Sequence, residues 1–177
     1  MGMILRIASS RIVGQGDIVG RSGYFSLNLS ANSVMRGRLD ARRTLKSLVA
    51  DLRMDKKGDT VAVIALGDFY QKGQKVVEML AGKGINATLI NPRFVSGIDE
   101  EMLEGLKKDH KLVVTIEDGC IDGGFGERIS RYYGPSEMKT ICFGVRKALY
   151  DRYDVEQLLR DNHLTEEQIV ADVLNLI

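Results

Sequence analysis

The chain has 177 residues, of which 44% are hydrophobic, so it can fill the core of one domain with or without an appendage. No apolar run approaches the roughly 20 residues that cross a bilayer, and Arg6 interrupts the N-terminal segment too early for a secretory signal. Cys120 and Cys142 form no CxxC pair, which disfavours a structural zinc site or a disulfide. We therefore expect a cytoplasmic protein without membrane contacts.

The net charge of +1 is the sum of two unequal segments. Residues 1–59 contain 11 Lys and Arg against 5 Asp and Glu, whereas residues 60–177 contain 14 against 19. This asymmetry is typical of two segments with different roles, but we favour the alternative that the basic and acidic parts belong to one folded unit and face each other or solvent. The change near Gly58 from dense turn formers to a regular pattern predicts a basic N-terminal appendage or linker over 1–59 and a separate domain over 60–177. Within the appendage, apolar residues spaced three and four apart predict one amphipathic helix from Arg38 to Met54.

From residue 60 onward, short apolar runs alternate with amphipathic segments of helical length. Thr60 to Leu66 is continuously apolar and rich in β-branched residues, as in a strand that is buried on both faces of a parallel sheet. Further strands are expected at 85–90, 111–117 and 138–143, with Asn91-Pro92 ending the first of these. Helices are expected at 69–81, 99–108 and 127–133, followed by two terminal helices that begin after Asp154 and Thr165. This order predicts an α/β fold with three layers, α/β/α, around a largely parallel sheet of about five strands.

A glycine-rich segment follows the strand that is expected at 111–117. In open α/β sheets, ligands bind at the carboxyl ends of the strands, and a helix N-terminus offers free N–H groups to anions. One hypothesis is therefore an anion-binding or interface loop, and the other is a tight turn in which the glycines serve packing. Two carboxylates in the segment would repel a phosphate, which favours the turn. The residues of interest are Asp118, Gly119, Gly123, Gly124 and Gly126, with Asp122 as the second carboxylate.

The other polar residues do not form a recognisable catalytic or binding motif. The stretch from Gly67 to Lys75 does not match a phosphate loop, because Gln74 stands where that motif needs Lys. His110 and His163 follow polar helix ends without a metal-like partner three or four residues away, so we expect both at the surface. No catalytic, cofactor-binding or metal-binding residue is assigned.

Four short motifs occur in a set order: Ala65 to Phe69, Gly84 to Phe94, Ile98-Asp99, and Thr115 to Gly126. In this order they resemble the C-terminal domain of the 1-deoxy-D-xylulose-5-phosphate synthase family, a transketolase-type fold. The resemblance covers about the last two-thirds of the chain. Enzymes of this family condense pyruvate with glyceraldehyde 3-phosphate, using thiamine diphosphate and magnesium, on the route to isoprenoid precursors and thiamine. Their cofactor motifs lie in other domains.

The resemblance implies a non-catalytic dimerisation domain of such a transferase, inactive and without cofactor on its own. It implies two partners, a second copy of the chain and the cofactor-binding domains of the parent enzyme. An alternative is a free-standing subunit or interaction module, as in split transketolases or the β-chain of 2-oxo-acid dehydrogenases. A third hypothesis, ligand or nucleic-acid binding through the basic appendage, is disfavoured because Tyr24 and Phe25 are its aromatic residues and both lie outside the Arg-rich helix.

Overall fold

The structure is a computed structural model that describes residues 4–6, 24–26 and 51–177. The chain divides into two compact units, residues 1–43 and 44–177. In the first unit, β1 (Ile4–Arg6) and β2 (Tyr24–Ser26) form a two-stranded antiparallel ladder with Leu5 opposite Phe25.

The second unit is built on a five-stranded sheet with the strand order β3-β5-β4-β6-β7. Strand β3 runs antiparallel to β5, and all the other pairs are parallel. The strands are β3 (Asp51–Lys56), β4 (Thr60–Ala65), β5 (Thr88–Phe94), β6 (His110–Cys120) and β7 (Lys139–Val145). The helices are a 3-10 turn (Gly67–Phe69), α3 (Tyr70–Gly82), α4 (Glu100–Leu106), α5 (Phe125–Tyr133), α6 (Val155–Asp161) and α7 (Glu166–Leu174). No helix in the described part of the chain is long and apolar enough to span a membrane.

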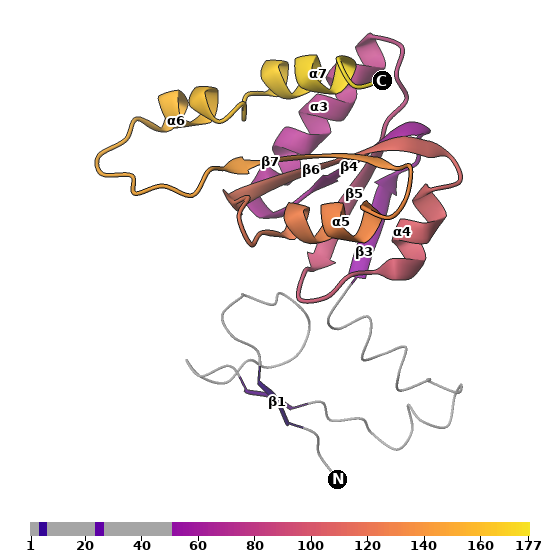
Figure 1. The fold of residues 1–177 in the computed structure, drawn as a ribbon, viewed down its shortest axis with the longest axis horizontal. Coiled ribbons are helices and arrows are strands. Elements are labelled where there is room, and N and C mark those ends of the chain that lie inside the picture. Colours follow the sequence, from indigo (N-terminus) through magenta and orange to yellow (C-terminus); the bar gives the residue numbers. More distant parts are fainter. Residues whose placement is uncertain (1–3, 7–23, 27–50) are drawn as a thin grey trace. The chain divides into compact units, whose positions relative to one another are not determined.

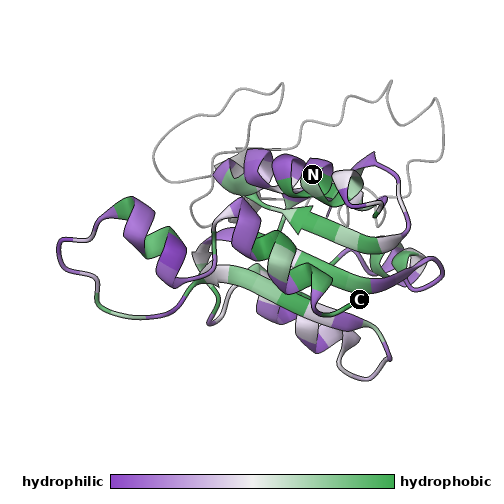
Figure 2. Ribbon diagram, turned by 90° about the horizontal axis from the view of Figure 1, so that it is seen from above, coloured by the Kyte–Doolittle hydropathy of each residue, from purple (hydrophilic) through white to green (hydrophobic). Residues whose placement is uncertain are grey.

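Helices cover both faces of the sheet (Figure 1), which confirms the predicted three-layer α/β fold. Val61 and Val63 of β4 belong to a core cluster shared with α3 and α7, whereas Ala62 and Ile64 belong to a second cluster shared with α4 and α5. Successive side chains of a strand point to opposite faces. Both faces of β4 are therefore buried, which explains its uninterrupted apolar sequence. Figure 2 shows the hydrophobic strands enclosed by helices with hydrophilic outer surfaces.

Three helices begin at polar residues that the sequence marks as caps. The side chain of Asp99 accepts a hydrogen bond from the backbone N–H of Met102 at 3.1 Å. Asp154 and Thr165 accept equivalent bonds from the residues three positions later, at 2.8 and 3.3 Å. Each cap satisfies an N–H group that has no partner inside its helix, so these predicted helix starts are confirmed.

Two predictions about local structure are wrong. Residues 51–54, expected to end a helix that begins at Arg38, form most of strand β3, while residues 38–50 lie outside the described residues. The sheet therefore begins at Asp51, ahead of the boundary expected at residue 60. Strand β5 does not end at Asn91-Pro92 but continues to Phe94. Strand β5 pairs with β4 through residues 88–90, so Pro92 lies beyond that pairing and is opposite β3 alone. The missing N–H of Pro92 therefore removes no hydrogen bond between β5 and β4.

Candidate functional site

The glycine-rich segment joins β6 to α5 at the carboxyl end of the sheet. Strand β6 is longer than the sequence predicts and includes Asp118 and Gly119, so the connecting turn is limited to residues 121–124. The strand is irregular here, because its pairing with β7 shifts between Ile116 and Cys120. The segment therefore stays close to the sheet.

A buried carboxylate occupies the start of α5. Glu117, 5% exposed, accepts hydrogen bonds from the backbone N–H groups of Phe125 at 2.9 Å and Gly126 at 3.1 Å. The residue that caps this helix is Gly124, which has no side chain of its own to accept these bonds. The N-terminus of a helix attracts anions through its free N–H groups and its dipole. Here the protein supplies that anion itself.

The glycines of the turn have different physical roles. Gly123 has a φ of +75°, a left-handed conformation that glycine adopts without strain. Gly124 and Gly126 do not have a positive φ. At these two positions a side chain is excluded because there is no room for a Cβ atom. A Cβ on Gly124 would lie 2.6 Å from a Glu117 carboxylate oxygen, and a Cβ on Gly126 would lie 2.4 Å from the Thr115 hydroxyl. Gly119, in contrast, has no atom close to the position of a Cβ.

The remaining carboxylates of the segment also contact backbone N–H groups. Asp118 is exposed and accepts a long hydrogen bond, 3.4 Å, from the N–H of Asp68 in the turn after β4. Asp122 accepts from the N–H of Lys147 at 3.2 Å, and Glu127 accepts from the N–H of Gly123 at 2.6 Å. The acidic side chains thus connect neighbouring loops at this edge of the sheet.

This geometry favours the packed turn over the anion-binding loop. The N–H groups that would hold a phosphate are already bonded to Glu117. Three further carboxylates of the segment bond other backbone N–H groups. Glu117 is not among the residues that the sequence led us to expect in this segment. The sequence does contain a signal for this role of Glu117. An acidic residue ends the apolar part of a strand, and the helix that follows begins after a glycine, which has no side chain to cap it. Asp118 is exposed and Gly119 is half-buried.

His110 is buried, so the prediction that it lies at the surface is wrong. It is 7% exposed, and its ring contacts the Leu106 carbonyl through Nδ1 at 3.2 Å and the Thr88 hydroxyl through Nε2 at 2.7 Å. A carbonyl can only accept, so Nδ1 carries a proton, and in the neutral ring the Thr88 hydroxyl then donates to Nε2. The Thr88 oxygen also accepts from the N–H of Gly58 at 2.8 Å. These bonds join the turn before β4 to β5 and β6. His163 is exposed, as predicted, and lies 2.8 Å from Asp172.

A shallow pocket of about 430 Å³ lies near the opposite end of β6, beside α4. Met54, Met102 and Leu106 contribute apolar surface to it, and Asp99 and Glu101 contribute carboxylates. Over residues 51–177 and the two short strands, no three His, Cys, Asp or Glu side chains are grouped so that they could hold a metal ion.

The comparisons with known proteins agree with this fold. A family model described as "Transketolase, C-terminal domain" matches residues 50–176. The chain is 32% identical over 121 residues to 1-deoxy-D-xylulose-5-phosphate synthase of Gloeothece citriformis, covering 67% of this chain and 19% of that protein. It is 33% identical over 123 residues to the enzyme of the same name from Alkaliphilus oremlandii, covering 66% and 19%. The chain therefore spans about a fifth of the length of these relatives.

Among solved structures, the chain is similar to one titled "Split gene transketolase, inactive beta4 tetramer". The TM-score is 0.64 at 25% sequence identity, and the match covers 71% of this chain and 41% of that chain.

Proposed function

The chain belongs to the transketolase C-terminal domain family, and from this premise we propose that it is the non-catalytic structural domain of a larger transferase. The parent enzyme is a thiamine-diphosphate-dependent 1-deoxy-D-xylulose-5-phosphate synthase, which serves isoprenoid precursor and thiamine synthesis in the cytoplasm. The relatives that carry this name, each matched over 19% of its length, support this assignment.

The observation that carries the non-catalytic role is the bonding of Glu117. At the carboxyl edge of the sheet, where an α/β domain binds its ligands, the helix N-terminus is already occupied by a side chain of the same domain. Thiamine diphosphate and magnesium are accordingly assigned to the partner domains of the parent enzyme. The role of this domain is to pack against those domains and to join two copies of the chain.

A domain exchange tests this role directly. Residues 50–176 would replace the corresponding segment of the Gloeothece citriformis synthase, beside a version of that enzyme from which the segment is deleted. A structural domain should restore activity with pyruvate and glyceraldehyde 3-phosphate that the deletion abolishes. A folded chimera with no more activity than the deletion would contradict the proposal.

A binding experiment tests the absence of a cofactor site in this chain. Calorimetric titration of the purified chain with thiamine diphosphate and magnesium should give no heat of binding, while the intact Gloeothece citriformis enzyme serves as the positive control. A micromolar dissociation constant for the chain alone would overturn the assignment of the cofactor to other domains.

The second candidate function is a free-standing subunit of a split transketolase or of an enzyme like the β-chain of 2-oxo-acid dehydrogenases. The likeness to a split transketolase chain, of which this chain covers 41%, favours it. Purification of the chain from its source cells distinguishes the two. A separate co-purifying polypeptide with a thiamine-diphosphate-binding sequence would support the split enzyme.

A further inference from the structure

The proposed structural role makes no use of the pocket beside α4. The pocket lies next to α4 and β3, which are neighbours in Figure 1 and are joined where the N–H of Leu52 donates to Asp99 at 3.3 Å. Its volume of about 430 Å³ falls within the roughly 300–1,000 Å³ that are typical of small-molecule sites. Such sites combine apolar walls with a few polar groups, and this pocket has both.

Two methionines provide the apolar wall of the pocket. Met54 of β3 and Met102 of α4 both line it, and both are half-buried. They pack against the same core cluster, which includes the buried Leu106. Methionine side chains are flexible and polarizable, and they are frequent at surfaces that adapt to different ligands. This wall therefore suits a small aliphatic group.

Gly105 keeps part of the pocket open. It belongs to the lining, and no atom lies within 4 Å of the position that its Cβ would take. Glycine is unfavourable inside a helix, and the packing of α4 does not require it at this position. A large side chain here would occupy space that glycine leaves empty, so the pocket can be filled by a single substitution.

The carboxylates of the pocket differ in what they already bind. Asp99 is fully engaged, since its two oxygens accept from the N–H groups of Met102 at 3.1 Å and Leu52 at 3.3 Å. Glu101 and Asp109 are exposed, and neither side chain has a hydrogen bond or an ion pair with another described residue. Glu101 and Asp109 are therefore available to a positively charged group in the pocket.

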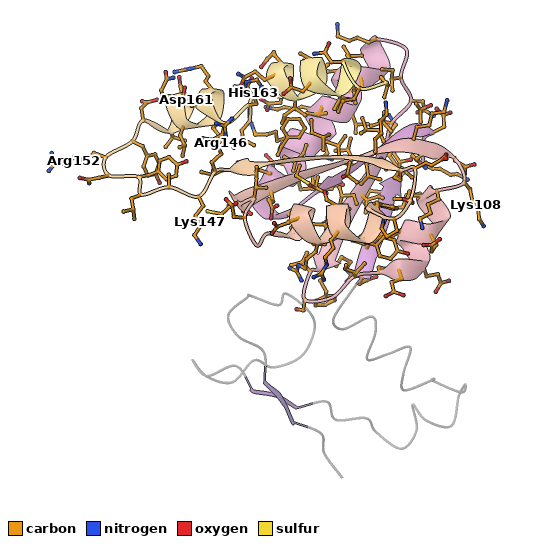
Figure 3. The ribbon with its side chains drawn as sticks, in the orientation of Figure 1. Lys108, Arg146, Lys147, Arg152, Asp161 and His163 are labelled. Carbon is orange, nitrogen blue, oxygen red and sulfur yellow. The ribbon has the colours of Figure 1, made fainter. Side chains whose placement is uncertain are left out.

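Lys57 gives the pocket a charge of the opposite sign. It is exposed and makes no ion pair within the described part of the chain. It lies in the connection between β3 and β4, which adjoins the end of α4 because the N–H of Thr60 donates to the Asp109 carbonyl at 3.0 Å. Figure 3 shows the nearby Lys108 pointing away from the domain, and Lys108 does not line the pocket. The ammonium group available to a ligand is that of Lys57.

We propose that this pocket binds a free α-amino acid with an aliphatic side chain. The carboxylate of the ligand pairs with Lys57, and its ammonium group pairs with Glu101 or Asp109. Its side chain lies on Met54 and Met102. Because the pocket is shallow and ion pairs in contact with water are weak, we expect a dissociation constant of about 1 mM. This inference goes beyond the structural role and does not depend on it.

Titration of the isotope-labelled full chain, followed by the NMR shifts of its backbone amides, tests the inference. The probe L-leucine should shift the amides of the pocket residues in a saturable way. Leucinamide, which lacks the carboxylate, and N-acetylleucine, which lacks the ammonium group, should each bind about two- to fivefold more weakly. The absence of saturable shifts with L-leucine up to about 20 mM would overturn the inference. Equal binding of leucinamide would overturn the recognition of an amino acid in favour of a simple amine.

Three variants locate the site. Gly105→Leu should remove the response to L-leucine, whereas Gly82→Leu should keep it, because Gly82 is a helical glycine outside the pocket whose Cβ position is also open. Lys57→Ala should weaken L-leucine about two- to fivefold and leave leucinamide unchanged. Amide shifts away from the pocket report whether each variant is folded.

Unchanged binding of L-leucine to a folded Gly105→Leu variant would place the ligand elsewhere and overturn the inference. If that variant does not fold, Lys57→Ala decides, and equal affinity of this variant and the wild type for L-leucine would likewise overturn the inference. The domain exchange tests the structural role separately, so failure of one proposal leaves the other standing.

Discussion

The Oε2 atom of Glu117 lies 2.9 Å from the backbone nitrogen of Phe125, so the last buried residue of β6 is the anionic partner of α5. The second carboxylate oxygen contacts the nitrogen of Gly126 at 3.1 Å. A single side chain therefore satisfies two N–H groups that would otherwise be buried without acceptors at the start of the helix.

Replacing Glu117 by Gln should lower the free energy of unfolding by about 1.5–3 kcal/mol, the range for hydrogen bonds to a charged group. The amide keeps the size of the side chain, but its NH₂ group faces a backbone donor. Urea unfolding measures the effect. Asp118→Asn is the control, since Asp118 is exposed and its contact with Asp68 is 3.4 Å long, and it should change stability by less than about 0.5 kcal/mol. Equal losses in both variants would contradict a special role for Glu117.

Gly126→Ala and Gly105→Ala should have opposite effects, although both place alanine in a helix. A Cβ on Gly126 would lie 2.4 Å from the Thr115 hydroxyl oxygen, so this substitution should destabilise the domain by about 1–3 kcal/mol. Gly105 in α4 has no neighbour within 4 Å of the Cβ position, and alanine there should stabilise by about 0.5–1 kcal/mol. Thermal unfolding compares them, and a gain from Gly126→Ala would refute the steric explanation.

Thr88→Val should cost about 2–3 kcal/mol, because it leaves both His110 Nε2 and the N–H of Gly58 buried without a partner. Thr88→Ser keeps the hydroxyl group and removes one methyl group, so a loss of about 1 kcal/mol is expected. Guanidinium unfolding of the two variants separates the hydrogen bonds from the packing. If serine were as damaging as valine, the hydroxyl group would not be the stabilising element.

Glu166 should make stability depend on pH in the acid range. The Lys72 and Lys75 ammonium groups each lie 3.4 Å from its carboxylate and connect α7 to α3. Burial pushes the pKa of Glu166 upward, but its backbone hydrogen bond and the charge of Lys72 outweigh burial and hold the pKa below its ordinary value of 4.5. The folded state therefore favours the ionised form. The resulting stabilisation is complete above the unfolded pKa and is lost as the pH falls through the folded pKa.

Glu166→Gln should accordingly cost about 0.5–1 kcal/mol at neutral pH, and the difference from the wild type should shrink below about pH 4.5. Unfolding curves at several pH values measure this. Glu167→Gln, an exposed neighbour in the same first turn of α7, controls for the helix dipole and should show a smaller difference at neutral pH. A difference for Glu166→Gln that stays constant down to pH 3 would exclude the ion pairs as its cause.

The main features of the fold could be predicted from the sequence because they follow from local patterns. The apolar run of β4 and the caps at Asp99, Asp154 and Thr165 each depend on residues within one element, and the structure has them as expected. Strand β3 could not be predicted in this way. Its residues continue a helical pattern of leucines, but pairing with β5, almost 40 residues later, outweighs that local preference.

The same distinction applies to the candidate site. Gly123, Gly124 and Gly126 could be recognised as important from their density, but their separate roles could not. The role of Gly126 depends on Thr115 in another element, and the role of Gly124 depends on Glu117. The burial of His110 likewise results from Thr88 and Leu106, which are brought to it by the parallel arrangement of the strands. The acidic character of the segment could be read from the sequence, whereas the bonding of Glu117 to the start of α5 could not.

The strand order has a consequence for the protein during its synthesis. Strand β4 lies between β5 and β6, and both of these neighbours are made after it. When a ribosome has released β4 and β5 but not yet β6, one side of a strand that is apolar from Val61 to Ala65 still has no partner. Unpaired apolar strand edges promote association between chains. Fragments that end before His110 should therefore aggregate, and this domain depends on completion of β6 to become soluble.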